Sequence, residues 1–446
     1  MKSKLIAIVS ILVIFALLLT ACGQKAADSG KDAPAESTLK EEPTKEEPAK
    51  EEPAKEEPKK VSLTATTNLV GEWSKVLEDM LKAYSAENPN VTIEFSAPGK
   101  EYENLLKVRM ASSDMPDLFS THGWSQIRYG DFVADLKDRP WASQIDPAFK
   151  PIIGDDTGKV YALAFDQDKS GPIYNVEVFQ KYGVEVPETL DELMAACETI
   201  KTKSNGEVTP IACAAEGWEE AQFFDFFASS LFISPKDNSS AQLLDGSFDW
   251  NKWDVLAQTW LDMYKKGYIN KNMLTAKYDD NLKAMALGTA AIGFYGPYFI
   301  DEMKAVNPDV KADMMPIPSI VAGDTPTFAG GERSTIAVWK DSTNLEEALK
   351  VIDFCAQPDN VAKMCTFTKL PPALLGVEAD AGELAATYEK YKDIRTLPYF
   401  DRVYLPNGMW DVMCKNSQMI IGGQITARQF SENMEKEYLR LRSIQD

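Results

Sequence analysis

From residue 61 onward, the chain alternates between short segments with a period of two and longer segments with a helical period. Residues 61–66 alternate apolar and polar side chains, which predicts a strand. Residues 73–84 place apolar side chains at helical spacing, and a second alternating strand follows at 91–95. A helix at 102–111 and a short buried strand at 116–120 come next. Strands that alternate with helices predict an α/β fold with mainly parallel sheets.

A second pattern of the same kind begins near residue 160. Its predicted strands are 160–165, 172–175 and 290–294, and its predicted helices are 178–182, 190–201, 253–266, 281–287 and 345–356. Residues 314–318 are expected to be extended, because each proline disfavours helix in the residue before it. Helices are predicted again from about residue 408 to 442. The length from residue 61 onward is enough for two ordinary domains.

The first residues have a different pattern. Lys2 and Lys4 precede an apolar run at 5–19, and small residues lead to Cys22. A positive start, a short apolar core and small residues predict a secretory signal peptide over 1–21. The cysteine after Thr20-Ala21 resembles the lipobox of bacterial lipoproteins, in which that residue is lipidated and becomes the N-terminus. An ordinary transmembrane anchor with a chance cysteine is the alternative.

Residues 22–60 predict a disordered, lipid-anchored tether. Within them, residues 41–60 repeat a five-residue pattern that starts with Glu-Glu-Pro. Proline in every repeat prevents a continuous helix, and apolar residues that could build a core are lacking. An extended segment that rises about 3 Å per residue would reach roughly 60 Å from the membrane.

Charge and residue counts exclude several function classes. The formal net charge is −21, most of it after residue 60, which argues against nucleic-acid binding and against adsorption to anionic lipid. The single histidine, His122, excludes His-rich metal sites and, unless it serves itself, a Ser-His-Asp triad. Phosphate-binding and nucleophile-elbow motifs are also missing. We therefore expect a protein that is not an enzyme and needs no cofactor.

Cysteine usage predicts buried free thiols and not a disulfide framework. Five cysteines follow Cys22, namely Cys197, Cys213, Cys355, Cys365 and Cys414. Their number is odd, no two of them form a CxxC motif, and most lie in apolar or helical segments.

One segment matches a calcium-binding pattern. From Asp166 to Glu177, oxygen donors fall at positions 1, 3, 5 and 12 of the twelve-residue EF-hand loop, with glycine at position 6. An EF-hand also needs a helix entering the loop, whereas residues 160–165 predict a strand. Calcium stays an alternative, and we expect no metal site.

The order of short motifs resembles the extracellular solute-binding proteins of ABC importers, in the family that includes maltose-binding protein. The motifs are Met115-Pro116-Asp117-Leu118-Phe119, Tyr161–Phe165 with Ile173-Tyr174-Asn175, Ala286–Ile292 through Gly296-Pro297-Tyr298, Gly330-Gly331 with Ile336–Val338, Pro358-Asp359-Asn360 and Leu370-Pro371-Pro372. Each motif alone is weak, but their order extends over nearly the whole body and follows a lipobox.

The resemblance implies a two-lobed fold of the periplasmic-binding-protein type, in which each lobe is a mainly parallel sheet flanked by helices. The chain would cross a hinge near Asp166, Pro318 and Pro371. Lobe 1 would then comprise 61–166 and 318–371, and lobe 2 would comprise 167–317 and 372–446. A ligand cleft would lie between the lobes.

Sugar recognition needs aromatic rings that stack on pyranose faces and polar groups that bind hydroxyls. The residues of these types on the expected ligand loops are Trp73, His122, Trp124, Asp166, Glu216, Trp218, Tyr298, Glu332, Arg333 and Trp410. The tryptophans at 250, 253, 260 and 339 are predicted to pack in the core. Tyr298 follows Gly-Pro where many relatives have tryptophan, which keeps a stacking face and adds a hydroxyl.

We therefore expect a monomeric receptor, tethered by lipid to the outer face of the cell membrane of a Gram-positive bacterium. It would capture a solute, expected to be a carbohydrate and in particular an oligosaccharide, and deliver it to the transmembrane subunits of an ABC permease. Two alternatives stay open: a non-sugar ligand such as a polyamine, and a lipoprotein glycoside hydrolase with two carboxylates. A surface adhesin would predict repeats after residue 60, and the sequence there shows none.

Overall fold

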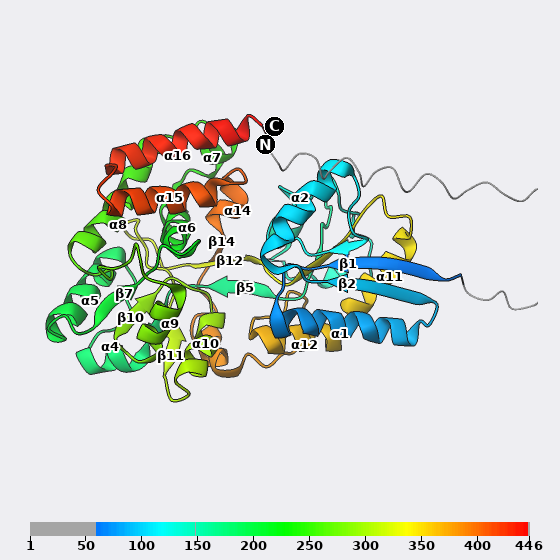
Figure 1. The fold of residues 1–446 in the computed structure, drawn as a ribbon, viewed down its shortest axis with the longest axis horizontal. Helices are drawn as coiled ribbons and strands as arrows, with labels where there is room; N and C mark the ends of the chain where they lie inside the picture. Colours follow the sequence, from blue (N-terminus) through cyan, green and yellow to red (C-terminus); the bar gives the residue numbers. More distant parts are fainter. Residues whose placement is uncertain (1–58, 148, 445–446) are drawn as a thin grey trace, which may run out of the picture. The chain divides into compact units, whose positions relative to one another are not determined.

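A computed structural model describes residues 59–147 and 149–444, which belong to one compact unit (Figure 1). The signal peptide, Cys22 and nearly all of the tether lie outside the described residues, so the predictions for them stay predictions. Within the described part of the chain, no helix combines the length and the apolar character needed to cross a bilayer.

Lobe 1 is built on a five-stranded sheet. Its strands are β1 (Val61–Thr66), β2 (Val91–Ser96), β3 (Leu118–Phe119), β4 (Leu163–Ala164) and β13 (Thr335–Val338), and its helices are α1 (Gly71–Glu87), α2 (Tyr102–Ser112), α3 (Lys150–Ile153), α11 (Leu345–Cys355) and α12 (Pro358–Thr368). The strand order is β2-β1-β3-β13-β4.

The alternation of side chains along its strands explains why helices cover both faces of this sheet. Leu118, Ile336 and Val338 pack in a core with residues of α1, α11 and α12. Their neighbours Phe119 and Ala337 point to the opposite face and pack with residues of α2. Lobe 1 therefore has three layers, helix, sheet and helix (Figure 1).

Lobe 2 is larger. Its strands are β6 (Ile173–Asn175), β7 (Thr209–Ala212), β8 (Ile233–Ser234), β9 (Asp237–Asn238), β10 (Ala290–Gly293) and β11 (Ala312–Met314). Its helices are α4 (Val176–Tyr182), α5 (Leu190–Lys203), α6 (Glu219–Phe232), α7 (Ser240–Asp245), α8 (Asp254–Lys265), α9 (Tyr278–Ala286), α10 (Tyr298–Val306), α13 (Ala385–Lys390), α14 (Phe400–Tyr404), α15 (Met409–Ile421) and α16 (Ala427–Arg442).

The central sheet of lobe 2 has the order β11-β6-β10-β7, and it too is covered on both faces. Along β7 and beyond it, Ile211 and Cys213 face a large core with α5, α6, α8, α15 and α16. Ala212 faces a second core with α9 and α10. The tryptophans at 250, 253 and 260 are buried in the large core, and Trp339 is half-buried in lobe 1, which confirms their predicted packing roles.

A third, three-stranded sheet joins the lobes. It consists of β5 (Gln167–Ser170), β12 (Phe328–Glu332) and β14 (Thr396–Pro398), in the order β14-β12-β5. β12 runs antiparallel to β5, with Asp168 opposite Gly331, and parallel to β14. We call these strands the hinge sheet, because β5 and β12 lie between the two lobes (Figure 1).

The α/β class and the flanking helices are confirmed, but the sheets are mixed and not mainly parallel. β1, β2 and β3 pair in parallel, as strands joined by helices do. β13, by contrast, follows hinge strand β12 with no helix between them and runs antiparallel to β3 and β4. In lobe 2, β6 likewise runs antiparallel to both of its neighbours. The prediction of mainly parallel sheets assumed a crossover helix before every strand, whereas a strand that enters a lobe directly from the hinge needs none.

The calcium alternative is wrong in its geometry. Within the segment from Asp166 to Glu177, all of which is described, residues 167–170 form β5 and pair with β12. A strand therefore stands where an EF-hand needs a loop between two helices.

The packing of residues close to the expected crossings bears on where the chain passes between the lobes. Ile317 and Ala329 belong to the large core of lobe 2, beyond the predicted crossing at 318. Ala373 and Leu374 belong to the core of lobe 1, beyond the predicted crossing at 371. We therefore propose that the chain passes between the lobes close to Glu332 and again after residue 374.

All five described cysteines are buried free thiols, as predicted.

Candidate functional site

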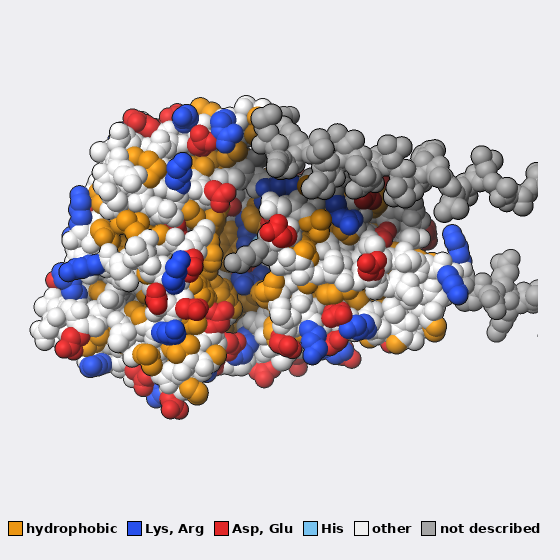
Figure 2. Space-filling model, viewed as in Figure 1, with side chains coloured by type: hydrophobic (Ala, Val, Ile, Leu, Met, Phe, Trp, Pro, Cys, Tyr) orange, Lys and Arg blue, Asp and Glu red, His pale blue; other side chains and the backbone are white. Residues whose placement is uncertain are grey.

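A hollow of about 340 Å³ opens between the two lobes. Its lining combines residues of lobe 1, the hinge sheet and the segment around α14, namely Gly123, Trp124, Gln126, Ile127, Ile152, Gly330, Gly331, Glu332, Thr396, Pro398, Tyr399, Arg402, Val403 and Tyr404. Figure 2 shows the surface hollowed between the lobes, with hydrophobic and Lys or Arg side chains gathered there. This mixture suits a ligand with both apolar faces and hydrogen-bonding groups.

Trp124 is the centre of the lobe 1 wall. The guanidinium carbons of Arg128 and Arg402 lie over its ring at 3.9 Å and 5.2 Å from the centroid. His122 contacts the ring edge-on, with 5.2 Å between the ring centroids. Gly123 makes this packing feasible, because a Cβ there would lie 2.4 Å from Nη1 of Arg402, and its φ of +91° favours glycine.

Two arginines of the site connect the lobes. Arg128, in lobe 1, forms an ion pair with Glu103 and donates a hydrogen bond of 2.5 Å to Oδ1 of Asn407, which precedes α15. Arg402, on α14, reaches back over Trp124. Glu103 also accepts a hydrogen bond of 2.8 Å from Nδ1 of His122, so that nitrogen carries the proton. Burial lowers the pKa of His122, and nearby Arg402 lowers it further against the opposing effect of Glu103.

Glu332 fastens the loop that carries Trp124. It is 2% exposed, and its carboxylate accepts hydrogen bonds from Oγ1 of Thr121 at 2.5 Å and from the backbone N of Ser125 at 2.7 Å. Burial raises its pKa, while these bonds act in the opposite direction. Glu332 therefore shapes the wall of the hollow, and its carboxylate is already occupied.

Arg333 lies between aromatic rings of the two lobes. Its guanidinium carbon is 4.8 Å from the ring centroid of Trp73 in lobe 1 and 5.1 Å from that of Tyr298 in lobe 2. Nη1 of Arg333 lies 3.2 Å from Oδ2 of Asp168. Burial alone would lower the pKa of Arg333, but Asp168 acts in the opposite direction together with Tyr399, Tyr298 and Asp166, and the net effect raises that pKa. The structure thus brings three of the predicted site residues together.

Trp218 and Glu216 lie on the lobe 2 side, beside a tyrosine cluster. Trp218 precedes α6, and its ring is 5.9 Å from Tyr295 and 6.2 Å from Tyr278, measured between centroids. Glu216 accepts a hydrogen bond of 2.9 Å from the backbone N of Tyr278 and pairs with Lys277 at 3.1 Å. Glu216 therefore holds the start of α9, and its expected contact with a ligand stays a prediction.

Two predicted residues lie apart from these contacts. Asp166 is fully buried at the hinge, where it accepts hydrogen bonds from the backbone N and Oγ of Ser334 at 3.0 and 2.6 Å. Burial raises its pKa to about 6. Trp410, in the first turn of α15, is half-buried against the lobe 2 core. The geometry gives Asp166 a structural role, and neither residue lines the hollow.

Several site residues were not predicted from the sequence. Arg128, Tyr399 and Arg402 surround the hollow or its tryptophan, and Asp168 holds Arg333. The segment 396–404 carries two tyrosines and an arginine within nine residues, which is a usable signal for a binding segment. Its position opposite Trp124 depends on the hinge crossings and is not visible in the sequence.

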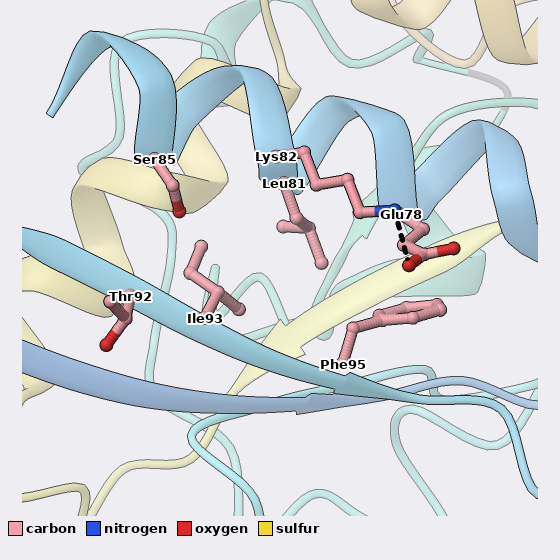
Figure 3. A pocket seen from close by; sticks show the side chains of 7 residues that line it. All are labelled: Glu78, Leu81, Lys82, Ser85, Thr92, Ile93 and Phe95. Carbon is pink, nitrogen blue, oxygen red and sulfur yellow. Dashed lines mark ion pairs between the residues drawn. The ribbon is translucent and has the colours of Figure 1, made fainter. Parts of the chain in front are cut away.

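A second hollow, of about 320 Å³, lies between α1 and edge strand β2 (Figure 3). Its lining comes from lobe 1 alone and includes the ion pair of Lys82 with Glu78 at 2.6 Å. It contains none of the predicted site residues. Among the described residues, no cluster of three or more His, Cys, Asp or Glu could hold a metal ion.

Comparisons with known proteins agree with this arrangement. The family model of the bacterial extracellular solute-binding proteins matches residues 69–362. The melibiose/raffinose/stachyose-binding protein MelE of Bacillus subtilis is 40% identical over 364 residues, which cover 81% of this chain and 85% of MelE.

Solved structures agree as well. The binding protein MsmE of Bacillus subtilis, in an open conformation, is 38% identical with a TM-score of 0.82, covering 87% of this chain and 99% of its own. A sugar transporter protein of Bacillus licheniformis in complex with stachyose is 44% identical with a TM-score of 0.76, covering 85% and 100%. This chain belongs to the family of bacterial extracellular solute-binding proteins.

Proposed function

We propose that this protein binds an oligosaccharide of the melibiose, raffinose and stachyose group between its lobes and delivers it to an ABC importer. The observation that carries the proposal is the 40% identity to MelE over 81% of the chain. Because the match covers 81% of this chain, it includes segments of both lobes.

The cleft chemistry supports a neutral sugar. Trp124 offers a ring for the apolar face of a pyranose, and Arg402 and Arg333 offer planar sets of donors for hydroxyls. Trp73 and Tyr298 add two further rings. The same two guanidinium groups disfavour a polyamine, because they would repel its positive charges.

Binding would act by closing the lobes. A ligand that contacts both walls stabilises the closed arrangement over the open one, and the importer would recognise the closed form. Membership of a solute-binding family favours such capture over the glycoside hydrolase alternative.

We further propose that Cys22 carries the lipid anchor and that the tether holds the receptor at the outer face of the membrane. In cells, a Cys22→Ala variant should be released into the medium instead of sedimenting with membranes. If the variant stays in the membrane fraction to the same extent as the native chain, the anchor proposal is wrong.

Isothermal titration calorimetry tests the ligand. We expect the chain, purified from membranes in detergent, to bind raffinose and stachyose at micromolar concentrations and not to bind spermidine. Sugar recovered intact from the complex distinguishes capture from hydrolysis. Heat from spermidine with none from any saccharide would refute the proposal.

A further inference from the structure

Asp168 has contacts that no predicted role explains. We infer that Asp168 is a positioning residue: it holds the Arg333 guanidinium in place for the ligand without touching the ligand itself. This inference rests on the proposed function, in which Arg333 donates hydrogen bonds to a bound sugar.

The burial of the two partners differs sharply. The side chain of Asp168 is fully buried, whereas 22% of the Arg333 side chain is exposed. Oδ2 of Asp168 accepts hydrogen bonds from Nη1 of Arg333 at 3.2 Å and from the hydroxyl of Tyr399 at 2.9 Å. Oδ1 accepts a bond of 2.8 Å from Oγ of Ser170. Both carboxylate oxygens are therefore occupied, and Arg333 is the most exposed of the three partners, ahead of Tyr399 and Ser170.

The contacts of Arg333 fix its position from three sides. The ion pair with Asp168 holds Nη1, while the rings of Trp73 and Tyr298 lie 4.8 and 5.1 Å from the guanidinium carbon. A guanidinium has five N–H groups, so most of its donors are left for other partners. A long side chain that is already ordered loses less rotamer entropy when it binds a ligand.

The backbone makes Asp168 suitable for this role. It lies on β5 directly opposite Gly331 of β12, two residues before Arg333. Tyr399 follows β14, and its backbone N donates to the carbonyl of Gly330 at 3.0 Å. The carboxylate of Asp168 thus receives groups carried by all three strands of the hinge sheet or the residues next to them. Its position is set by the part of the molecule that both lobes share.

A double-mutant cycle tests the inference. The variants are Asp168→Asn, Arg333→Met and the double variant, and the measurement is the Kd for raffinose. Asp168→Asn keeps the side-chain volume and removes the charge, so we expect affinity about tenfold weaker. If Asp168 acts through Arg333 and not through its other partner at the hollow, Tyr399, Asp168→Asn should change the Kd less than twofold when Arg333 is already methionine.

Ser170→Ala is the matched control. It removes the hydrogen bond to Oδ1 and leaves the Arg333 contact, so the Kd should stay within twofold of the native value. If Asp168→Asn does not fold, as judged by its thermal transition, Asp168→Ser replaces it in the cycle. An equal loss of affinity in the native and the Arg333→Met backgrounds would overturn the inference, and so would no loss in the native background.

A ligand-free measurement separates this inference from the proposed function. In protein labelled with ¹⁵N-arginine, the Nε–Hε order parameter of Arg333 should fall in Asp168→Asn and stay unchanged in Ser170→Ala. An unchanged order parameter in Asp168→Asn overturns the positioning role, whether or not raffinose binds. Absence of raffinose binding by the folded native chain refutes the sugar proposal alone.

Discussion

Trp124 is the aromatic ring that lines the hollow in lobe 1, where it meets cationic groups from both lobes. Replacing it by alanine should remove a stacking surface, and we expect raffinose affinity about tenfold weaker, within the range of aromatic contacts. Trp124→Phe keeps a ring and should lose less. Calorimetry gives the Kd, and a thermal scan confirms folding. Equal losses in the two variants would show that the ring face does not contact the sugar.

Glu219 is a buried acid that should make stability depend on pH. It is 2% exposed, accepts hydrogen bonds from the hydroxyl of Tyr295 at 2.5 Å and from Nδ2 of Asn281 at 3.0 Å, and burial raises its pKa to about 7. A raised pKa means that the folded state binds the proton more tightly than the unfolded chain. The stabilisation is complete below about pH 4.5 and is lost as the pH rises through 7.

The variant Glu219→Gln isolates this contribution, because the amide does not titrate. Between pH 5 and pH 8, the native chain should lose up to about 3 kcal/mol of unfolding free energy relative to Glu219→Gln. Urea unfolding at the two pH values measures the difference. Parallel pH dependences for the two proteins would show that Glu219 titrates normally.

At the residue scale, the sequence was informative about residue types and weak about their orientation. Trp124 lines the hollow, whereas Arg333 lies beside the rings of Trp73 and Tyr298 and not in the lining of that hollow. Asp166 carries the same type of side chain as Asp168 but is bonded to Ser334 inside the hinge. Which acid faces an arginine depends on strand register, which a single sequence does not reveal.

At the scale of elements, β12 contains two adjacent glycines with different surroundings. A Cβ on Gly330 would lie 2.2 Å from the carbonyl oxygen of Asp168 and 2.4 Å from Thr396, whereas a Cβ on Gly331 would meet only Tyr399 at 3.5 Å. Gly330→Ala should therefore push the hinge strands apart and cost about 1–3 kcal/mol of unfolding free energy.

Gly331→Ala is the matched comparison, with an expected cost below about 1 kcal/mol. Both variants change the same strand by the same methyl group, so chemical denaturation of the pair tests the close approach at Gly330 directly. Similar stabilities for the two variants would contradict the tight packing of β12 between β5 and β14.

The long helices and the first strands were predictable, and the hinge strands were not. α1, α5, α8 and α11 have strong helical periodicity, and β1 and β2 alternate clearly. β5 is four residues long and polar, and β12 contains two glycines, so neither shows a strand pattern. Their strand geometry comes from pairing with each other, which is a long-range contact.

At the scale of the whole described unit, the lobes also touch away from the cleft. Lys369, at the end of α12, pairs with Asp301 of α10 and lies 3.5 Å from Glu383, which in turn pairs with Lys304. These contacts favour lobes that stay close when no ligand is bound. The variant Lys369→Met removes the two contacts of Lys369. It should shift the equilibrium between closed and open lobes toward the open form by a factor of about 2 to 5, as for exposed ion pairs.

Small-angle scattering of the ligand-free chain measures this shift as a larger radius of gyration. With saturating raffinose, the native and variant curves should coincide. Lys392→Met is the control, because Lys392 pairs with Glu389 within one lobe at 2.7 Å. A radius that changes equally in both variants would mean that the contacts of Lys369 do not link the lobes.

The position of β13 in the lobe 1 sheet has a consequence for biosynthesis. β13 lies between β3 and β4, although at least 170 residues separate it from either strand in the sequence. At about 5–20 residues per second, roughly 15–55 seconds of translation pass between the synthesis of β1 and that of β13. During this time lobe 1 lacks a central strand and cannot complete its core. The topology thus delays the folding of lobe 1 until most of the chain has been synthesised. A chain that is still unfolded can pass through a translocation channel.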